Sequence, residues 1–469
     1  MTSRNVVVAP PSERDGAATQ APMSYPQQLL AAFAMRGGGS VFGPSSVNWC
    51  AHRLTGPVDV DVLRQALDDV VRRQGALRTV VVREEGFPFQ RVRPPAGVPL
   101  TVLDRNGIDP QDRNAEVARI TAKALADGQP SDRVPLLSAY LVRFGYDVSA
   151  LVLVIHRTAA DGWTMQLAIR DVMAGYERRL RGEPPDRTPL PQYVECALAD
   201  RSAEREKQIR AALPYWERTL GDLPVVGIPA DHPRPVDGTG GVRALHTFEL
   251  PDRMVQEVRR AARTARTSFF TLLLTAYALS LTARTGGSEI AIPVLGAGRG
   301  RQQWDTAGFF VNGHVLRLGM PAEQTLATVV ARVHRAGIAA QTNDVPLIRV
   351  LGALPNIAAS AFDSSVVVPT PIQLCQPIPE FADDRATVRY QRMVLPPEVV
   401  AEQPVMPVDF LWTMEPYTSF VVRVMYNPRM FTAHGVARLA DDFERALGLL
   451  VTTPQISVRA ARVAMETAR

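Results

Sequence analysis

The pattern of apolar and polar residues changes its period within one stretch in the first half of the chain. Residues 150–155 are apolar without a break, which predicts a strand that is buried on both faces. Residues 156–163 are mostly polar and follow directly. From residue 165 onward apolar side chains recur at helical spacing, which predicts an amphipathic helix with a buried face of Met165, Ile169, Val172, Met173, Tyr176 and Leu180. A strand that leads through a polar loop into a helix is a common way to build a functional site on a rigid base.

Similar patterns predict helices and strands along the rest of the chain. Asp59, Ser268 and Thr432 each precede an apolar helical repeat, and all three are residue types that cap helix N-termini. The helix after Ser268 is largely apolar, which predicts burial between a sheet and other helices. Alternation over residues 418–426 predicts a strand with Phe420, Val422, Val424 and Tyr426 on one face. This mixture predicts an α/β protein, with α+β layers in each lobe.

The chain is longer than one average domain, so we expect its 469 residues to form two domains or lobes. Residues 1–22 have no continuous apolar run, which predicts a disordered N-terminal tail rather than a signal peptide. The proline-rich residues 228–235 mark the expected boundary between an N-terminal lobe, residues 23–230, and a C-terminal lobe, residues 231–469.

Charge and cysteine content argue against several classes of function. The chain has 52 basic and 47 acidic side chains, and its arginines are dispersed, so a nucleic-acid partner is not expected. Cys50, Cys196 and Cys375 are odd in number and far apart, which is typical of reduced thiols in a cytoplasmic protein and argues against a zinc site. The most apolar helix, residues 269–281, is too short to span a bilayer, so no membrane partner is expected.

The polar segment after the apolar strand has the sequence His156-Arg157-Thr-Ala-Ala-Asp161-Gly162-Trp163. It resembles the His-His-x-x-x-Asp-Gly signature of the condensation-domain superfamily of nonribosomal peptide synthesis. In that family the second His is the catalytic one, and this chain has Arg157 in its place. Other segments resemble further family elements in the right order, namely residues 24–28, 72–79, 215–216, 228–235, 296–299, 307–317 and 426–431.

The resemblance implies the chloramphenicol-acetyltransferase-like fold. In that fold two similar α/β lobes form a V around a central tunnel. A crossover segment from one lobe packs against the other lobe, and we expect this segment near residues 360–407. The implied partner is a peptidyl or acyl carrier protein, whose phosphopantetheine arm tethers a substrate. Because the chain has no adenylation or carrier motif, we expect a free-standing, monomeric protein whose carriers are supplied in trans. We expect no bound cofactor, metal ion or nucleotide.

The resemblance also implies roles for the signature residues, which we expect to form the catalytic site (His156, Arg157 and Asp161). Neighbours on an extended backbone point to opposite sides, so only one of His156 and Arg157 can face the tunnel. The family gives His156 the structural position, hydrogen-bonded behind the loop, and a chemical role is the alternative. Asp161 is expected to form an ion pair with Arg299 of the second lobe, because an unpaired buried carboxylate would be costly.

Other candidate residues surround the signature. Gly162 and Trp163 are expected to be structural, Gly162 because it would let the backbone turn tightly into the helix. Five residues of other family elements are expected to contact the tunnel or the substrate: Ser24, Gln27, Arg78, Asn312 and His314. For Arg78, a helix-end ion pair or a surface position is the alternative. For His314, which could replace the missing His, a satisfied position in the core or on the surface is the alternative.

Arg157 decides the expected chemistry. Because the pKa of a guanidinium exceeds about 12, Arg157 cannot act as a general base. It could donate hydrogen bonds to a developing oxyanion or hold a carboxylate. An α-amine has a pKa of about 8 and is partly neutral without help, whereas an alcohol needs a base. The nucleophile is therefore expected to be an amine, free or carrier-bound. Heterocyclisation is not expected, because the Asp-x-x-x-x-Asp form of the signature is absent.

Three functions remain open. The first is a condensation-type acyltransferase of nonribosomal peptide or related biosynthesis that forms amides from a carrier thioester without the usual His. The second is a catalytically inactive module that binds a carrier protein or recruits a tailoring enzyme. The recruitment domains of glycopeptide synthetases have a His-Arg-x-x-x-Asp-Asp signature, from which Gly162 departs. The third is hydrolysis, cyclisation or release. An open tunnel at Arg157 would favour an enzyme, and a plugged tunnel would favour a binding module.

Overall fold

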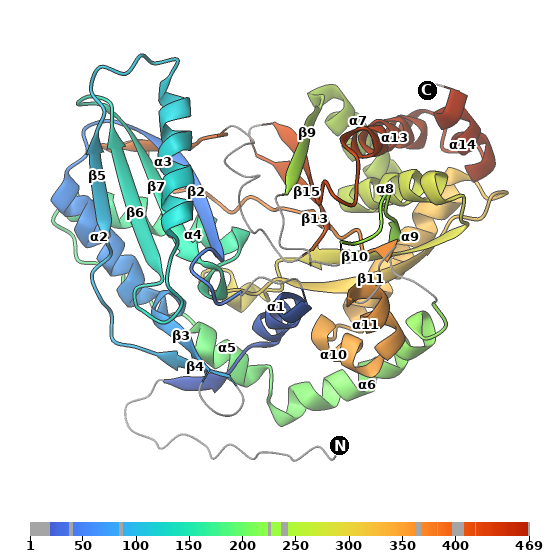
Figure 1. The fold of residues 1–469 in the computed structure, drawn as a ribbon, viewed down its shortest axis with the longest axis horizontal. Helices are drawn as coiled ribbons and strands as arrows, with labels where there is room; N and C mark the ends of the chain where they lie inside the picture. The colour runs from blue at the N-terminus through green and yellow to red at the C-terminus, as the bar shows by residue number, and fades with distance from the viewer. Residues whose placement is uncertain are drawn as a thin grey trace.

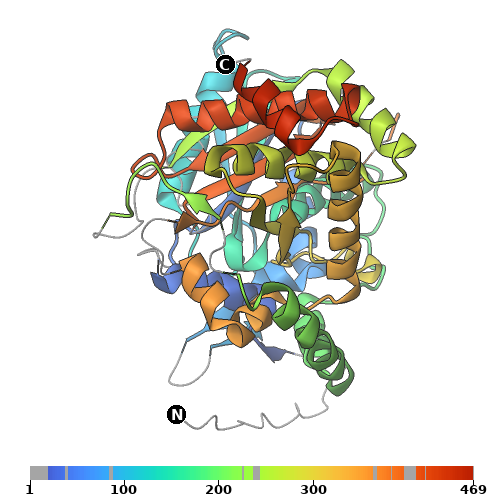
Figure 2. The same ribbon diagram turned by 90° about the vertical axis from the view of Figure 1, so that its right-hand side faces the viewer.

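The computed structural model describes residues 19–36, 41–83, 88–223, 227–235, 243–362, 367–381, 383–395, 408–417 and 419–467. Two α/β lobes lie side by side, each built on one mixed β-sheet with helices packed against it (Figures 1 and 2). The predicted α/β class is therefore confirmed. None of the sheets in the described part of the chain closes into a barrel.

The first sheet has β7 at its centre. Its strands follow the order β14 (Arg389–Arg392), β2 (Val47–Thr55), β7 (Val148–His156), β6 (Leu137–Arg143) and β5 (Leu100–Asp104). Neighbouring strands are antiparallel except β5 and β6, which are parallel. One face packs against α2 (Val60–Arg73) and α4 (Gly162–Leu180), and the other packs against α3 (Arg113–Asp127). Leu151, Leu153 and Ile155 of β7 enter the first core, whereas Ala150, Val152 and Val154 enter the second, which explains the unbroken apolar run.

The second sheet is covered by helices on one face. Its strands follow the order β11 (Asn312–Gly319), β10 (Glu289–Gly296), β13 (Ile372–Leu374), β15 (Phe410–Pro416), β16 (Phe420–Tyr426) and β9 (Ala244–Leu250). The helices are α7 (Asp252–Thr264), α8 (Phe269–Thr285), α9 (Leu326–Thr342), α13 (Ala433–Thr452) and α14 (Val458–Thr467). Phe420, Val422, Val424 and Tyr426 all enter the core beneath these helices, as predicted.

Smaller elements complete the fold. A small sheet has the order β1 (Gln20–Pro22), β4 (Phe89–Val92) and β3 (Thr79–Val82), and β8 (Ile228–Pro229) pairs with β12 (Val367–Val368). The remaining helices are α1 (Tyr25–Arg36), α5 (Tyr193–Ala199), α6 (Ala203–Leu220), α10 (Leu347–Ala353) and α11 (Pro355–Phe362). The three predicted caps are present, because the side chains of Asp59, Ser268 and Thr432 each accept backbone N–H groups of the helix that follows.

The structure differs in two places from the predicted division of the chain into a tail and two lobes. Most of the predicted tail, residues 1–22, lies outside the described residues, but its end forms β1, which pairs with β4 and is not disordered. α6 precedes the boundary expected at residues 230 and 231, yet its Ile209, Trp216 and Leu220 pack into the core of the second lobe. The predicted division of the chain therefore does not coincide with the division between the cores.

One strand passes from the second half of the chain to the first sheet. β14 pairs in antiparallel register with β2, so that Arg392 lies opposite His52 and Arg389 opposite Thr55. β14 falls within the region where a crossover is expected, although residues 396–407 lie outside the described part. Within the described residues, no helix is long and apolar enough to cross a membrane.

Candidate functional site

His156 lies behind the loop that follows β7. It is fully buried; its Nδ1 accepts a hydrogen bond from the Thr158 hydroxyl at 2.8 Å, and its Nε2 donates to the Gly43 carbonyl at 3.2 Å. Burial lowers the pKa of His156 to about 4, so the ring is neutral at neutral pH. Both ring nitrogens are engaged, which supports a structural role for this residue rather than a chemical one.

Arg157 points to the other side of the same loop, as the alternation predicts, and lines a cavity. The residue is 6% exposed, and its Nη2 donates to the Val47 carbonyl at 2.9 Å. Among the described residues no carboxylate lies within ion-pair distance of it. Burial lowers the pKa of Arg157 to about 10, below the value expected from the sequence. The guanidinium nevertheless stays protonated at neutral pH, so it cannot serve as a base there.

Asp161 forms the predicted ion pair with Arg299. The shortest distance is 2.6 Å, from Arg299 Nη1 to Asp161 Oδ2, and the two side chains are 2% and 0% exposed for Asp161 and Arg299 respectively. The same carboxylate accepts the backbone N–H groups of Thr164 at 2.9 Å and of Phe310 at 2.9 Å. Asp161 therefore caps α4 in the first lobe and binds two segments of the second lobe at once.

The residues beside Asp161 extend this contact between the lobes. The indole of Trp163 donates to the Trp304 carbonyl at 2.8 Å, and the Thr164 hydroxyl donates to the Gly308 carbonyl at 2.8 Å. Gly162 differs from the expectation, because its backbone shows no left-handed φ and an added Cβ would have no atom within 4 Å. A tight turn is not the reason for this glycine; it is the first residue of α4 and lines the cavity of Arg157.

The cavity beside Arg157 has a volume of about 290 Å³ and is bounded by both lobes. β2 and the start of α4 form one wall, and the open face of the second sheet forms the other. The walls are largely apolar, with Trp49, Met165, Leu245, Leu295, Phe309, Val311, Leu411 and Met425 among the lining residues. Arg157 thus lies at an open space, which favours the hypothesis of an enzyme.

Polar and charged residues gather at one part of this cavity. Arg392 Nη2 lies 3.2 Å from Glu415 Oε2, and Arg423 Nε lies 3.4 Å from Glu415 Oε1. The Arg392 guanidinium stacks 3.9 Å from the ring centre of Tyr417. His52, 7% exposed, also lines the cavity, and burial lowers its pKa to about 3.

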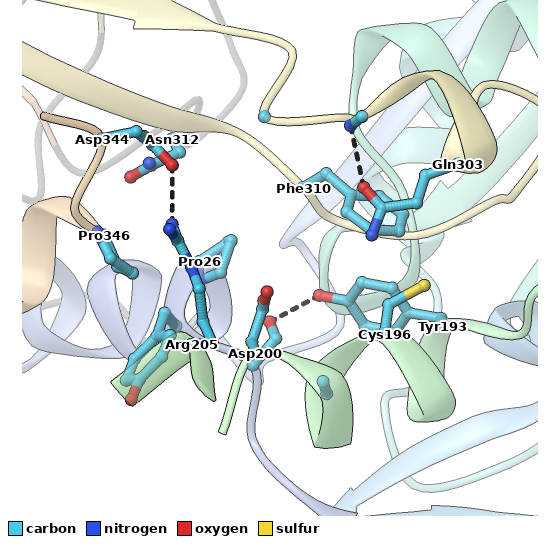
Figure 3. Close-up of a pocket in the computed structure, with 15 residues that line it drawn as sticks. Pro26, Tyr193, Cys196, Asp200, Arg205, Gln303, Phe310, Asn312, Asp344 and Pro346 are labelled. Atoms are coloured by element: carbon cyan, nitrogen blue, oxygen red, sulfur yellow. Dashed lines mark hydrogen bonds and ion pairs between the residues drawn. The ribbon is translucent and has the colours of Figure 1, made fainter. Parts of the chain in front are cut away.

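A second cavity of about 230 Å³ lies on the other side of the segment 309–312 (Figure 3). Phe309 and Val311 line the first cavity, whereas Phe310 and Asn312 line the second. In the second cavity Arg205 is paired with Asp344 at 2.6 Å. This single backbone segment thus lies between the two cavities.

Two more residues of the second cavity stand out. The Tyr193 hydroxyl shares a hydrogen bond of 2.6 Å with the Ser24 hydroxyl and donates to the Phe309 carbonyl at 2.6 Å. Burial raises the pKa of Asp200, whose carboxylate has no hydrogen-bond partner among the described residues.

The expected tunnel residues fall into two groups. Ser24 and Asn312 line the second cavity. Gln27, Arg78 and His314 line neither cavity. Gln27 donates to the Thr158 carbonyl at 2.9 Å and so supports the signature loop from behind. Arg78 donates to the Arg93 carbonyl at 2.9 Å, and His314 is bonded to Asp344 at 3.1 Å and stacks on Trp216. The contacts of His314 match the alternative of a satisfied position, whereas Arg78 is half-buried and bonded to a backbone carbonyl, with no ion pair among the described residues.

Several charged or polar residues of the cavity were not predicted from the sequence, among them His52, Arg392, Glu415 and Arg423. A signal exists for some of them, because polar residues alternate with apolar ones on the strands that carry them. Asn48, Cys50 and His52 alternate on β2, and Thr413 and Glu415 alternate with core residues on β15. When one face of a strand packs against helices and the other face has polar residues, the polar face is predicted to line a cavity rather than a second helix layer.

The protein has the chloramphenicol-acetyltransferase-like fold. Two lobes enclose a cavity, and the signature loop joins them. The family model of the Condensation domain matches residues 44–468. The chain therefore belongs to the condensation-domain family.

Two curated relatives are much longer proteins. Chondramide synthase cmdD of Chondromyces crocatus is 28% identical over 415 residues, 86% of this chain and 10% of that protein. Isonitrile lipopeptide synthase of Mycobacterium tuberculosis is 33% identical over 309 residues, 63% of this chain and 12% of that protein. This chain thus spans at most 12% of these two synthases.

Solved structures resemble this chain along most of its length. The SgcC5 protein of Streptomyces globisporus, in complex with (R)-(-)-1-(2-naphthyl)-1,2-ethanediol and sucrose, has a TM-score of 0.81 at 28% identity, covering 93% of this chain and 100% of that chain. The X-domain from teicoplanin biosynthesis has a TM-score of 0.76 at 22% identity, covering 96% and 99%, and shows the shared fold alone.

Proposed function

We propose that this protein is a condensation-type acyltransferase that transfers an acyl group from a carrier-protein thioester to an amine. The observation that carries the proposal is the position of Arg157. It is a nearly buried cation without an acidic partner among the described residues, and it lines an open cavity beside the family's signature. A cation held in this way is suited to stabilise negative charge that develops on a substrate.

The proposed reaction needs no side chain that accepts a proton at the outset. The neutral amine attacks the thioester carbonyl, the new C–N bond forms, and Arg157 donates a hydrogen bond to the oxyanion. When the C–S bond breaks, the amine proton is transferred to the departing thiolate. Arg157 remains protonated throughout, because its pKa of about 10 lies well above neutral pH.

The titratable groups near Arg157 support an amine nucleophile over an alcohol. His156 has a pKa of about 4 and has both nitrogens engaged behind the loop. His52 lines the cavity, but its pKa of about 3 makes it a weak base. An amine has a neutral fraction without a base, whereas an alcohol depends on one.

The two cavities support a reaction between two tethered or diffusible partners. They lie on opposite sides of the segment 309–312, and Arg157 and Asp161 line the first cavity, whereas no residue of the signature lines the second. We propose that one partner enters through the first cavity and that the other approaches from the side of the second. We propose that a peptidyl or acyl carrier protein, supplied in trans, brings at least the donor on its phosphopantetheine arm.

The test is intact mass spectrometry of acyl-loaded carrier proteins incubated with candidate amines. We expect amide formation by the wild type and a loss of roughly 100-fold or more in Arg157→Gln, the scale of removing one oxyanion donor. Arg389→Gln is the matched control, because Arg389 is an exposed arginine of β14 and lines neither cavity. Undiminished transfer by Arg157→Gln would refute the role of Arg157.

One observation favours a second candidate, a non-catalytic module that binds a carrier protein or recruits a tailoring enzyme. The family's catalytic imidazole is absent, and the remaining His of the signature is locked by Thr158 and Gly43. Native mass spectrometry separates the two candidates: carrier binding without transfer to any amine supports the module and contradicts the acyltransferase.

A further inference from the structure

The cavity beside Arg157 has an excess of positive charge. Arg157, Arg392 and Arg423 line it, together with two carboxylates, Asp161 and Glu415. Asp161 is neutralised by Arg299, so among the described lining residues Glu415 is the anion that remains for three arginines. Because unpaired charge in a partly buried space is costly, such a cavity favours a ligand that brings a negative charge.

The region around Arg392 has unused hydrogen-bond donors. Arg392 donates a hydrogen bond to Glu415, at 3.2 Å, and another to the Tyr417 hydroxyl, although a guanidinium has five N–H groups in a planar fork. The ring of Tyr417 lies 3.9 Å from the guanidinium and limits its orientation. Glu415 is shared with Arg423, so one carboxylate serves two guanidinium groups.

His52 faces the same space. It lies directly opposite Arg392 in the antiparallel pairing of β2 and β14, and side chains of opposite residues stand on the same face of a sheet. His52 is 7% exposed, and its Nδ1 has no hydrogen-bond partner among the described residues. Because Nδ1 has no exposed surface, a ligand in the cavity can reach the ring only at Nε2, which can donate one hydrogen bond, so His52 and Arg392 together offer donors to such a ligand.

This region is separate from Arg157. Arg157 is bonded to the carbonyl of Val47, and His52 lies five positions further along the same strand. At about 3.4 Å per residue, the two points are roughly 17 Å apart. Apolar side chains such as Trp49 and Met425 are among the residues that line the same cavity. The cavity thus offers cationic donors near both ends and an apolar wall.

We propose that the substrate group bound in this cavity carries a carboxylate, which Arg392 and His52 bind while the reacting carbonyl lies at Arg157. Arg392 supplies the charge and His52 a hydrogen bond, while the apolar walls contact the chain between the two ends. The carboxylate belongs either to the acyl donor or to the amine. The placement of the reacting carbonyl rests on the proposed function; the carboxylate site itself does not.

Binding without turnover tests the site. Isothermal titration calorimetry compares octanoate with octanamide, which has the same shape but no charge. We expect octanoate to bind at least about 10-fold more tightly, the scale of a charge-assisted hydrogen bond. Arg392→Gln and His52→Phe should each reduce this preference, and Glu415→Gln, which removes the internal counter-ion, should increase it. Thermal unfolding checks that each variant is folded.

The matched control is Arg389→Gln, three residues away on β14 and therefore on the opposite face of the strand. It removes the same charge and should leave the preference unchanged. Equal binding of octanoate and octanamide by the wild type would overturn the proposal. So would an equal loss of preference in Arg389→Gln and Arg392→Gln, because the effect would then be one of net charge.

Turnover assays identify the source of the carboxylate. One arm compares the N-acetylcysteamine thioester of dodecanedioic acid with that of its monomethyl ester, and the other compares 12-aminododecanoate with 12-aminododecanamide as the amine. In both arms a long apolar chain separates the carboxylate from the reacting group, as the separation of the two ends of the cavity requires. A preference for the acid that Arg392→Gln removes assigns the carboxylate to the partner varied in that arm. A preference in neither arm, with turnover intact, overturns the proposal. Absence of all turnover with octanoate preference retained contradicts the acyltransferase and leaves the carboxylate site in place.

Discussion

The ion pair of Asp161 and Arg299 allows a quantitative prediction about how the lobes hold together. The change Arg299→Gln removes a guanidinium that is 0% exposed and leaves a carboxylate that is 2% exposed without a counter-ion. The remaining hydrogen bonds to that carboxylate come from two backbone N–H groups, those of Thr164 and Phe310. Breaking a buried pair by removing one partner costs about 3–5 kcal/mol of unfolding free energy.

The coupling between the two side chains separates this effect from a general loss of packing. The double variant Asp161→Asn/Arg299→Gln removes both charges, so it should be less destabilised than the sum of the single variants by about 2–3 kcal/mol. The matched control is Lys123 with Asp127, an ion pair of 3.0 Å whose side chains are 70% and 51% exposed. A double-mutant cycle at this pair should give about 0.3–0.5 kcal/mol, because solvent screens it.

Urea unfolding of the four proteins of each cycle, followed by tryptophan fluorescence, measures both couplings. Trp163 and Trp304 lie beside the buried pair, with ring centres 6.1 Å apart, so they report on the contact between the lobes. If the two cycles give the same coupling energy, burial does not strengthen this ion pair, and the reasoning is wrong.

Two further outcomes follow from single residues. Gly298 has φ +62°, and a Cβ there would collide with the Phe310 carbonyl oxygen. The variant Gly298→Ala should therefore displace the loop that holds Arg299 and lower the melting temperature. The control Gly352→Ala, where an added Cβ meets open space, should leave the melting temperature unchanged. His156 has a folded pKa of about 4 against about 6.5 unfolded, so the unfolded state takes up the proton first as the pH falls, and stability is lost from pH 6.5 downward. Between pH 7 and pH 5 this should cost about 2 kcal/mol, and a His156→Gln variant should show a smaller dependence in urea titrations at the two pH values.

The local part of the site could be predicted from the sequence. The apolar run of β7 and the helical repeat of α4 place the signature loop between them, and the pairing of Asp161 with Arg299 followed from the family resemblance together with the cost of a buried charge. The interpretation of Gly162 was wrong because a glycine at the first position of a helix needs no unusual backbone angle.

The far part of the cavity could not be predicted, because it is assembled from segments that are distant in the chain. His52 comes from β2, Arg392 from β14 and Glu415 from β15, and only strand pairing brings them together. The assignment of α6 failed for a related reason. A proline-rich segment marks where the chain turns, but the apolar face of a helix decides which core it enters, and that choice depends on the tertiary structure.

The pairing of β14 with β2 has a consequence for the order in which the protein can fold. The first sheet receives its edge strand from residues 389–392, so a nascent chain that has completed β7 and α4 still exposes the backbone of β2 at residues 52–55. An unpaired strand edge is a template for association with other chains. During synthesis the N-terminal lobe is therefore complete in sequence long before it is complete in structure, and shortened chains that end before β14 would be prone to aggregate.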